Sequence, residues 1–298
     1  MSAESETREA RLVQKRQLQI VIALSVGILV LETAGGLLSG SLALLSDAGH
    51  VLTDVLALVL SLMAVRFSSL PATPAKTYGY HRLEILTALL NGALLMVISA
   101  GILYKAVGRF LDPVPIHSGV MIGVACAGLL ANLAGVALLS GAPQSLNLRG
   151  ARMHVIGDAL SSVGVLLAGL VIALTGWRRL DPLVGGGIAV VIAVGSLRLV
   201  REAVDVLLEA TPAGIDLDDV SRAIVTVPGV VEVHDLHIWS ITTGLSALSG
   251  HVRLDGSGGE TSDVMLNRIK QTVRDRFGIV HTTIQIESCG YQELGDVH

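Results

Sequence analysis

The chain contains few charged and few aromatic residues for its length. Only 15% of its 298 residues are Asp, Glu, Lys or Arg, and only 3% are Phe, Trp or Tyr, whereas a soluble domain carries about 25% charged residues. Hydrophobic residues make up 51% of the chain, and they gather in runs of about 20 residues, which is long enough to cross a bilayer. These proportions argue against a soluble enzyme and indicate a polytopic membrane protein in contact with lipid.

Cysteine and net positive charge are also scarce. The two cysteines, Cys126 and Cys289, are too few for a disulfide framework and do not form a Cys-x-x-Cys pair, so we expect free thiols. The formal net charge is −4, which leaves no basic excess for a nucleic-acid surface. Nucleic acid is therefore not an expected partner.

Six apolar segments follow a charged stretch over residues 1–17. That stretch lacks the apolar core and cleavage site of a signal peptide, so we interpret it as a cytoplasmic N-terminal segment. Each apolar segment is close to the length of about 20 residues that a spanning helix needs. They cover residues 18–38, 42–65, 83–107, 120–139, 153–174 and 183–200. We expect an all-α six-helix transmembrane bundle, forming a transport domain over residues 18–210.

The placement of basic residues predicts the orientation of this bundle. Eleven Lys and Arg residues lie on one side of the six segments, in the N-terminal stretch, the second-to-third and fourth-to-fifth connections and the exit from the sixth segment. On the other side lie only Lys105, Arg109, Arg178 and Arg179. Because cytoplasmic loops carry the excess of positive charge, we expect both termini in the cytoplasm.

The composition becomes polar beyond the sixth segment. A Thr-Pro-Ala-Gly breaker over residues 211–214 marks the expected start of a second domain over residues 211–298. Sequence patterns there predict helices and strands in the order αββαβ, over residues 217–226, 231–241, 247–254, 262–277 and 281–287. This order predicts a small cytoplasmic α+β domain, ferredoxin-like or metallochaperone-like, with helices on one face of a sheet.

Ionisable residues within the apolar segments are the strongest functional signal. The second segment contains His50 and Asp54, and the fifth contains His154 and Asp158. A spacing of four residues places each pair on one face of a helix, and both pairs occupy similar depths. Two such helices side by side would bring together two imidazoles and two carboxylates, which suits tetrahedral Zn²⁺.

The charge balance of this set favours the same interpretation. Two ionised carboxylates and two neutral imidazoles offset a divalent cation, which lowers the cost of holding the ion away from water. The same groups take up protons when a metal leaves, so the set predicts exchange of metal for H⁺. For one His-Asp pair alone, an intrahelical hydrogen bond at a helix interface is an equal alternative. Two copies at matched spacing favour a shared ligand.

Other polar positions in the apolar segments leave alternatives open. Asp47 lies three residues before His50, so it is either an auxiliary group that receives metal or protons, or a cap of the second helix. Glu32 has no cation at helical spacing and is either a proton carrier or a group that lines a water-filled cavity, which we favour. Asn91 and Asn132 are expected to form interhelical hydrogen bonds.

Five sequence motifs are distributed along nearly the whole chain. They are Ser39–Asp54, Tyr78–Leu86, His154 with Asp158, His234–Trp239 and Thr283–Ser288. Together they resemble the cation diffusion facilitators, a family of proton-coupled divalent-metal exporters. The resemblance implies that His50, Asp54, His154 and Asp158 form the transport site, and that His50 is associated with zinc preference. It also implies a homodimer in the cell inner membrane.

Five of the nine histidines lie after residue 230, in the predicted cytoplasmic domain. His234 and His237 are three residues apart on a predicted strand and so face opposite sides of it, unless a bulge intervenes. The resemblance implies a metal-binding site formed by His234, His251, Glu287 and His281. The alternative is a set of exposed imidazoles without a metal.

These observations predict proton-coupled efflux of Zn²⁺ from the cytoplasm by a transporter that is not an enzyme. Zn²⁺ is the expected substrate and candidate regulatory ligand, and H⁺ is the expected coupling ion. His and Asp ligands also accept Cd²⁺, Co²⁺, Ni²⁺ and Fe²⁺. One alternative is an intramembrane metallohydrolase, which would need an open position on its metal and a general base. Another is a membrane-anchored metal sensor that uses only its tail.

Overall fold

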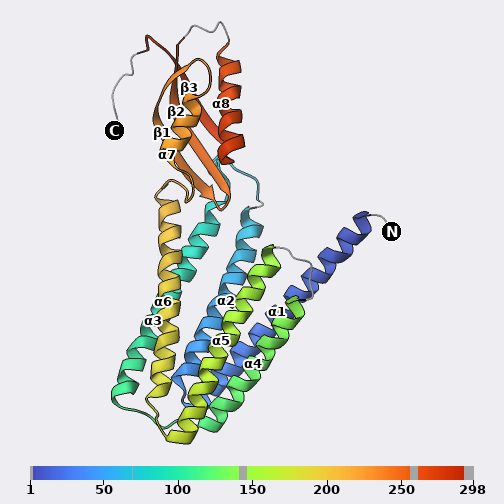
Figure 1. Cartoon of the computed structure of the whole chain (residues 1–298), viewed down its shortest axis with the longest axis vertical. Coiled ribbons are helices and arrows are strands. Elements are labelled where there is room, and N and C mark those ends of the chain that lie inside the picture. Colours follow the sequence, from blue (N-terminus) through green and yellow to red (C-terminus); the bar gives the residue numbers. More distant parts are fainter. Residues whose placement is uncertain (1–2, 69, 141–145, 256–260, 292–298) are drawn as a thin grey trace. The chain divides into compact units, whose positions relative to one another are not determined.

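The computed structural model describes residues 3–68, 70–140, 146–255 and 261–291 (Figure 1). The chain divides into two compact units, Met1–Leu62 with Leu90–Val200 and Met63–Leu89 with Arg201–His298. The first unit contains most of six long helices. The second unit contains a three-stranded sheet, two shorter helices and the segment that joins the second long helix to the third. Each unit is described separately below.

The long helices are α1 (Ala3–Ser39), α2 (Leu42–Ser68), α3 (Arg82–Leu111), α4 (Ser118–Ser140), α5 (Leu146–Thr175) and α6 (Leu180–Leu207). Among the described residues, all of these except α2 are long and apolar enough to cross a membrane. α2 is 27 residues long and carries the acidic residues of the second segment. The prediction of a helical transmembrane region is confirmed, and the chain is a multi-pass membrane protein.

The first helix begins much earlier than its apolar segment. α1 starts at Ala3, so most of the charged stretch over residues 1–17 is helical and continuous with the spanning segment. This stretch contains no Gly or Pro and is rich in Glu, Arg, Gln and Ala, which are residues of good helix propensity. Hydropathy marks where a helix becomes apolar, and it does not mark where the helix begins.

The start of α2 is capped by a side chain from another helix. Asp181, at the beginning of α6, is fully buried. Its carboxylate accepts hydrogen bonds from the backbone N–H groups of Leu42 (2.7 Å) and Ala43 (3.1 Å) and from the hydroxyl of Ser41 (2.6 Å). The first N–H groups of a helix lack intrahelical acceptors, and Asp181 supplies them. The capping alternative for Asp47 is therefore wrong, because Asp47 lies in the second turn.

Two glycines allow helices of the first unit to pack closely. A Cβ atom on Gly185 of α6 would lie 3.1 Å from the backbone oxygen of Leu42 in α2, and one on Gly35 of α1 would lie 2.5 Å from Cγ2 of Val124 in α4. Close backbone approach at small residues is the usual way in which membrane helices pack. These contacts bring α1 against α4 and α6 against α2.

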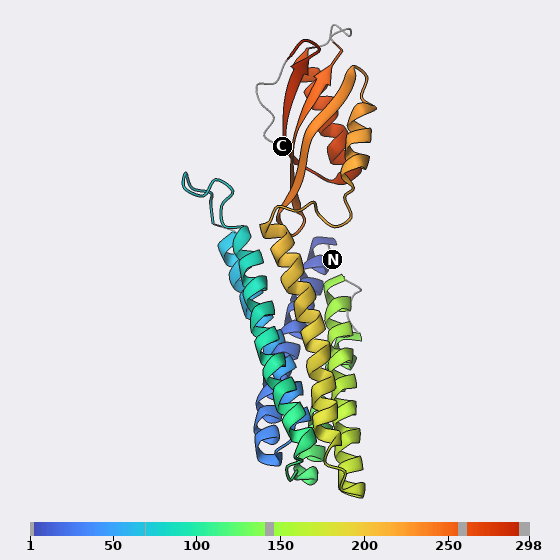
Figure 2. The same ribbon diagram turned by 90° about the vertical axis from the view of Figure 1, so that its left-hand side faces the viewer.

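The second unit contains the predicted αββαβ domain. Its elements are α7 (Leu217–Val225), β1 (Val230–Thr242), β2 (Leu245–Leu254), α8 (Ser262–Phe277) and β3 (His281–Ser288). The sheet order is β1-β2-β3, with β1 antiparallel and β3 parallel to β2. Figure 2 shows both helices on one face of the sheet, where apolar side chains of α7, α8 and the strands form one core. The prediction of a small α+β domain is confirmed.

The segment between α2 and α3 belongs to this second unit and contacts its domain. The guanidinium of Arg82 lies 2.7 Å from a carboxylate oxygen of Glu209, just beyond α6. The hydroxyl of Thr242, at the end of β1, donates a hydrogen bond of 2.6 Å to the carboxylate of Glu84, in the first turn of α3. These contacts tie the start of α3 to the sheet domain.

Candidate metal centres

Four side chains from α2 and α5 meet within the first unit. His50 Nε2 lies 3.8 Å from Asp54 Oδ2 and 3.6 Å from Asp158 Oδ1. His154 Nε2 lies 3.4 Å from Asp54 Oδ2 and 3.7 Å from Asp158 Oδ2. Each imidazole therefore lies close to both carboxylates, one on its own helix and one on the other. The four residues singled out by their spacing in the sequence form a single cluster.

The separations in this cluster suit a shared cation better than direct hydrogen bonds. Four ligand atoms about 2.0–2.2 Å from a tetrahedral Zn²⁺ ion lie about 3.3–3.6 Å from one another, whereas hydrogen bonds between N and O span about 2.7–3.2 Å. Asp54 Oδ2 and Asp158 Oδ1 are buried, and neither accepts a hydrogen bond within the described part of the chain. His50, Asp54 and Asp158 offer ligand atoms within 4.8 Å of one another. His154 Nε2 lies 3.4 Å from Asp54 Oδ2 and 3.7 Å from Asp158 Oδ2 but is outside that group of mutually close atoms.

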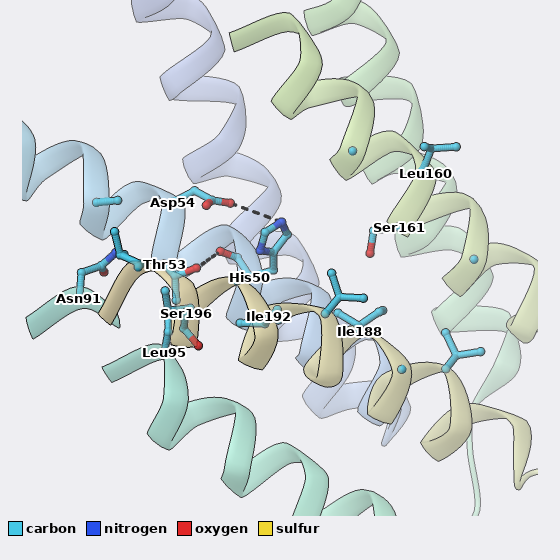
Figure 3. A pocket seen from close by; sticks show the side chains of 18 residues that line it. His50, Thr53, Asp54, Asn91, Leu95, Leu160, Ser161, Ile188, Ile192 and Ser196 are labelled. Atoms are coloured by element: carbon cyan, nitrogen blue, oxygen red, sulfur yellow. Dashed lines mark hydrogen bonds and ion pairs between the residues drawn. The ribbon is translucent and has the colours of Figure 1, made fainter. Parts of the chain in front are cut away.

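A cavity of about 820 Å³ adjoins the cluster (Figure 3). His50 and Asp54 lie on its wall together with polar groups of Thr53, Asn91 and Ser196, and apolar side chains of α3, α5 and α6 line much of the rest. The cavity leaves His50 and Asp54 open to the space between α2, α3, α5 and α6.

The two asparagines have different roles. Asn132 on α4 donates a hydrogen bond of 3.3 Å to Ser162 Oγ on α5, as the sequence predicted. Asn91 instead lines the cavity, and its buried Oδ1 has no hydrogen-bond partner among the described residues. The prediction of an interhelical hydrogen bond is therefore not met for Asn91, whose position beside the cavity depends on how α3 packs in the bundle.

Glu32 and Asp47 are buried next to the cluster. Their exposed fractions are 1% and 2%, and Asp47 Oδ1 accepts a hydrogen bond of 2.6 Å from the hydroxyl of Ser161 on α5. Glu32 is not among the residues that line the cavity beside His50 and Asp54, so a cavity-lining role for Glu32 stays a prediction. It lies against Gly128 of α4, where a Cβ atom would lie 3.0 Å from Glu32 Oε1.

A second cluster lies on the sheet of the second unit. His234 Nε2 lies 3.4 Å from Glu287 Oε2, and His251 Nδ1 lies 3.2 Å from Glu287 Oε1. His234 and His251 are paired across β1 and β2, with ring centroids 5.3 Å apart. Glu287 on β3 is 3% exposed. These three residues offer ligand atoms within 4.8 Å of one another.

A β-bulge shapes the edge of this second cluster. The register of β1 against β2 shifts between His234 and His237, and Asp235 between them has a φ of 49°, which is rare for a residue other than glycine. Asp235 Oδ1 lies 2.9 Å from His237 Nε2, and Asp235 Oδ2 lies 3.8 Å from His251 Nε2. Asp235 is an acidic neighbour of the cluster that sequence reasoning missed, because the bulge has no signal in the residue pattern.

His281 lies away from this cluster. It pairs with Ala247 at the beginning of β3, six residues before Glu287 and thus about 20 Å from it along the strand. The ring of His281 instead lies 5.6 Å from that of Tyr78, in the segment that precedes α3. The structure brings His234, His251 and Glu287 together, and it does not bring His281 to them.

The chain matches two families of known proteins. Residues 18–208 match the cation efflux transmembrane domain, and residues 212–289 match the cytoplasmic domain of the cation efflux protein, ZT_dimer. A cadmium, cobalt and zinc/H(+)-K(+) antiporter of Bacillus subtilis (strain 168) is 40% identical, over 92% of this chain and 89% of that protein.

Two other relatives are similar over comparable lengths. The metal cation efflux system protein CzcD of Cupriavidus metallidurans is 40% identical, over 92% of this chain and 86% of that protein. The zinc transporter ZitB of Escherichia coli (strain K12) is 38% identical, over 91% of this chain and 87% of that protein. A solved metal-bound C-terminal domain of CzcD is 41% identical, over 24% of this chain and 99% of that chain, with a TM-score of 0.22.

Proposed function

Because this chain belongs to the cation efflux family, we propose that it exports Zn²⁺ from the cytoplasm in exchange for H⁺. Membership of the family makes the chain a transporter of metal cations and not an enzyme. The printed names of its relatives support zinc as the main substrate, with cadmium and cobalt as further substrates. The name of the B. subtilis relative supports coupling to a counter-flow of cations.

The observation that carries this proposal is the cluster of two imidazoles and two carboxylates on α2 and α5. We propose that His50, Asp54, His154 and Asp158 hold the transported ion as a complete tetrahedral shell. Two carboxylates offset the charge of Zn²⁺, so the loaded site is neutral within the membrane. Metal and protons compete for the same ligand atoms, so an acidic medium outside the cell favours release, and the more alkaline cytoplasm favours loading.

The orientation of transport is part of the proposal. The excess of Lys and Arg beside the N-terminal stretch and the polar domain supports a cytoplasmic position for both termini, in the inner membrane of a bacterial cell. The boundaries of the transport domain at residues 18–210 and of the cytoplasmic domain at residues 211–298 belong to the same proposal. Export then moves Zn²⁺ away from the side that carries the sheet domain.

We propose a regulatory role for the second cluster. His234, His251 and Glu287 supply three ligands and one negative charge, so a bound dication keeps a free coordination position and a net positive charge. A partner subunit or water would supply the fourth ligand. The match of residues 212–289 to the ZT_dimer family supports a homodimer. Metal bound at the cytoplasmic domain would then regulate transport in the membrane domain.

The two alternative functions, an intramembrane metallohydrolase and a membrane-anchored metal sensor, predict a different use of the four-ligand cluster. A catalytic zinc ion keeps an open position beside a general base, whereas the proposed shell uses all four positions. A membrane-anchored sensor would bind metal at the sheet domain and produce no ion flux. Metal flux through the purified chain therefore separates export from both rivals.

The decisive experiment measures zinc uptake into inside-out vesicles that contain the full chain. Asp54→Ala should abolish uptake driven by an imposed pH gradient, because the shell loses a charged ligand. Ser99→Ala on α3 is the matched control, since Ser99 is buried and its hydroxyl forms no hydrogen bond with the described residues. Uptake by Asp54→Ala equal to that of the control would remove the four-ligand site from the transport mechanism.

A further inference from the structure

Asn91 on α3 is a buried polar side chain that the four-ligand shell does not use. Its exposed fraction is 6%, and its Oδ1 atom has no hydrogen-bond partner within the described part of the chain. A buried acceptor without a partner costs free energy. Asn91 lines the cavity that also contains His50 and Asp54 (Figure 3). The position of this amide therefore suits a ligand that enters the cavity and offers a positive charge or a proton to Oδ1.

The hydroxyl groups on the cavity wall present oxygen lone pairs to the cavity. Three of the described lining residues carry a hydroxyl group, and each donates its proton to an oxygen atom of the protein. The donors and acceptors are Thr53 and the backbone oxygen of His50, Ser196 and the backbone oxygen of Ala193, and Ser161 and Asp47 Oδ1. A hydroxyl has only one proton to donate. A molecule in the cavity therefore meets acceptors on these residues, which suits a cation and disfavours an anion.

Asn91 lies about one helical turn from the level of Asp54. A Cβ atom on Gly49 of α2 would lie 3.5 Å from a side-chain atom of Ile102 and 3.6 Å from one of Ile98 on α3. Because consecutive spanning helices run in opposite directions, Asp54 lies level with position 95 of α3. Asn91 is four residues further, which is about 6 Å along the helix. This displacement is toward the end of α2, which the proposed orientation places on the cytoplasmic side.

The cavity has room for a cation that still carries water. Its volume is about 820 Å³, whereas about six water molecules fill about 180 Å³, at about 30 Å³ each. Water bound to a cation directs its protons outward, where acceptors on the wall can receive them. The proposed tetrahedral shell leaves no position for water, so an ion must lose its water between the cavity and the shell. Amide and hydroxyl oxygens can replace water around a divalent cation.

We propose that Asn91, together with the hydroxyl oxygens of Thr53 and Ser196, forms an oxygen-donor site that holds the hydrated divalent cation before it enters the four-ligand shell. This inference rests on the proposed function and adds a binding step to it. The site is neutral and offers no imidazole or carboxylate, so it binds the ion weakly and passes it on. Permeation needs sites that an ion both enters and leaves easily. Such a site governs how fast Zn²⁺ arrives, and leaves the equilibrium affinity of the shell unchanged.

The experiment compares Asn91→Leu with wild type in inside-out vesicles that contain the full chain. Leucine keeps the approximate size of the side chain and removes its oxygen. Ser99→Ala is the matched control on the same helix, because Ser99 is buried, its hydroxyl has no hydrogen-bond partner among the described residues, and it does not line the cavity. Two quantities are measured: the initial rate of zinc uptake at zinc concentrations below KM, and the Kd of the shell for zinc.

The Kd of the shell is obtained by equilibrium dialysis, as the difference in bound zinc between each protein and its counterpart that also carries Asp54→Ala. Asn91→Leu should lower the initial rate by at least about tenfold, the effect of one hydrogen bond to a charged group, with the Kd within about twofold of wild type. Asn91→Asp keeps an oxygen donor and should retain at least the wild-type rate. Ser99→Ala should match wild type in both quantities.

Ser196→Ala gives a second test if Asn91→Leu does not fold. The Ser196 hydroxyl bonds to a backbone oxygen of its own helix, so its removal leaves the contacts between helices intact. The initial rate of zinc uptake should fall by a smaller factor than in Asn91→Leu, again without a change in the Kd of the shell. A wild-type rate in folded Ser196→Ala would overturn the inference when Asn91→Leu does not fold.

Other results would overturn the inference in distinguishable ways. A wild-type uptake rate in folded Asn91→Leu would mean that the ion reaches the shell without this site. A Kd weakened as much as the rate would make Asn91 part of the shell itself. An equal loss in Ser99→Ala, or no recovery in Asn91→Asp, would attribute the loss to the packing of α3. Absence of zinc uptake by wild type would instead contradict the proposed function.

Discussion

The two clusters of His and acidic side chains in this protein are built in different ways. In the membrane unit, two helices contribute one His-Asp pair each, and the cluster has four ligands with two carboxylates. In the sheet domain, three strands contribute one residue each, and the cluster has three ligands with one carboxylate. The first set can surround and neutralise a dication. The second leaves a bound dication with an open position and a residual charge.

This difference supports the proposal that the membrane cluster serves transport and the sheet-domain cluster serves regulation. An ion that crosses the bilayer must be stripped of water and balanced in charge, which four ligands with two negative charges achieve. A sensor needs to release its ion as the metal concentration falls, and a three-ligand site with an open position exchanges its ion more easily. The predictions below separate the two roles, from the largest expected effect to the smallest.

Removing one carboxylate from each cluster should give very different losses. Asp158→Ala should reduce zinc uptake into inside-out vesicles to background, because the transport shell loses a ligand and half of its charge. Glu287→Ala should retain uptake within about tenfold of wild type, toward the lower end of the roughly 5- to 150-fold range of typical coupling between sites. Both rates are measured on purified full chain with equal amounts of folded protein. Equal losses of zinc uptake in the two variants would contradict the assignment of transport to one cluster and regulation to the other.

Changing the donor type in the membrane cluster should alter selectivity more than rate. His50→Asp replaces an imidazole nitrogen by a carboxylate oxygen, and carboxylates suit Mn²⁺ better than imidazoles do. The ratio of Mn²⁺ to Zn²⁺ uptake should therefore rise relative to wild type. A panel of divalent metals in the same flux assay measures the ratio, and His251→Asp in the sheet domain is the control that should leave it unchanged.

Asp235 should tune the sheet-domain cluster without being one of its ligands. Its carboxylate lies 3.8 Å from His251 Nε2 and is 43% exposed, and exposed charge pairs contribute up to about 1 kcal/mol. Asp235→Asn should weaken zinc binding at this cluster by no more than about fivefold. Zinc binding is measured by equilibrium dialysis in a double variant that also carries Asp54→Ala. The second substitution removes binding at the membrane cluster, so only zinc at the sheet-domain cluster is counted. Complete loss of the remaining zinc would show that Asp235 is a fourth ligand.

His281→Ala should have the smallest effect. The imidazole contacts Tyr78 and lies at the far end of β3 from Glu287, so the number of zinc ions bound per chain should not change. Zinc content measured after dialysis against a weak chelator checks this expectation. A lower content would extend the second cluster to His281, as the resemblance to cation diffusion facilitators implied.

Sequence reasoning performed best where neighbours in space are neighbours in sequence. The His-x-x-x-Asp spacing predicted which side chains of α2 share a face with one another, and the same spacing predicted it for α5. Turn signals such as Asp216, whose side chain accepts from Asp219 N, and Gly278, with a φ of 70°, predicted the limits of α7 and α8. All of these depend on contacts within one or two turns of chain.

The errors came from contacts between distant parts of the chain. Asp181 caps α2 from 139 residues away, so no pattern near residue 42 could exclude a capping role for Asp47. Glu32 is buried against Gly128 of α4, a contact that depends on how whole helices pack and that the sequence of α1 alone does not reveal. Asp235 reaches His251 through a bulge that depends on the pairing of two strands.

The amino-acid sequence by itself determined the helical membrane class, the αββαβ domain and the His-Asp pairs on one face each of α2 and α5, since helix periodicity and hydropathy are local properties. Only the tertiary structure decided that the two pairs converge, that Asp47 meets Ser161 and Glu32 lies against Gly128, and that His281 is separated from Glu287. The physical reason is that helix packing and strand register result from many weak contacts between residues far apart in the chain, and no short stretch of sequence encodes them.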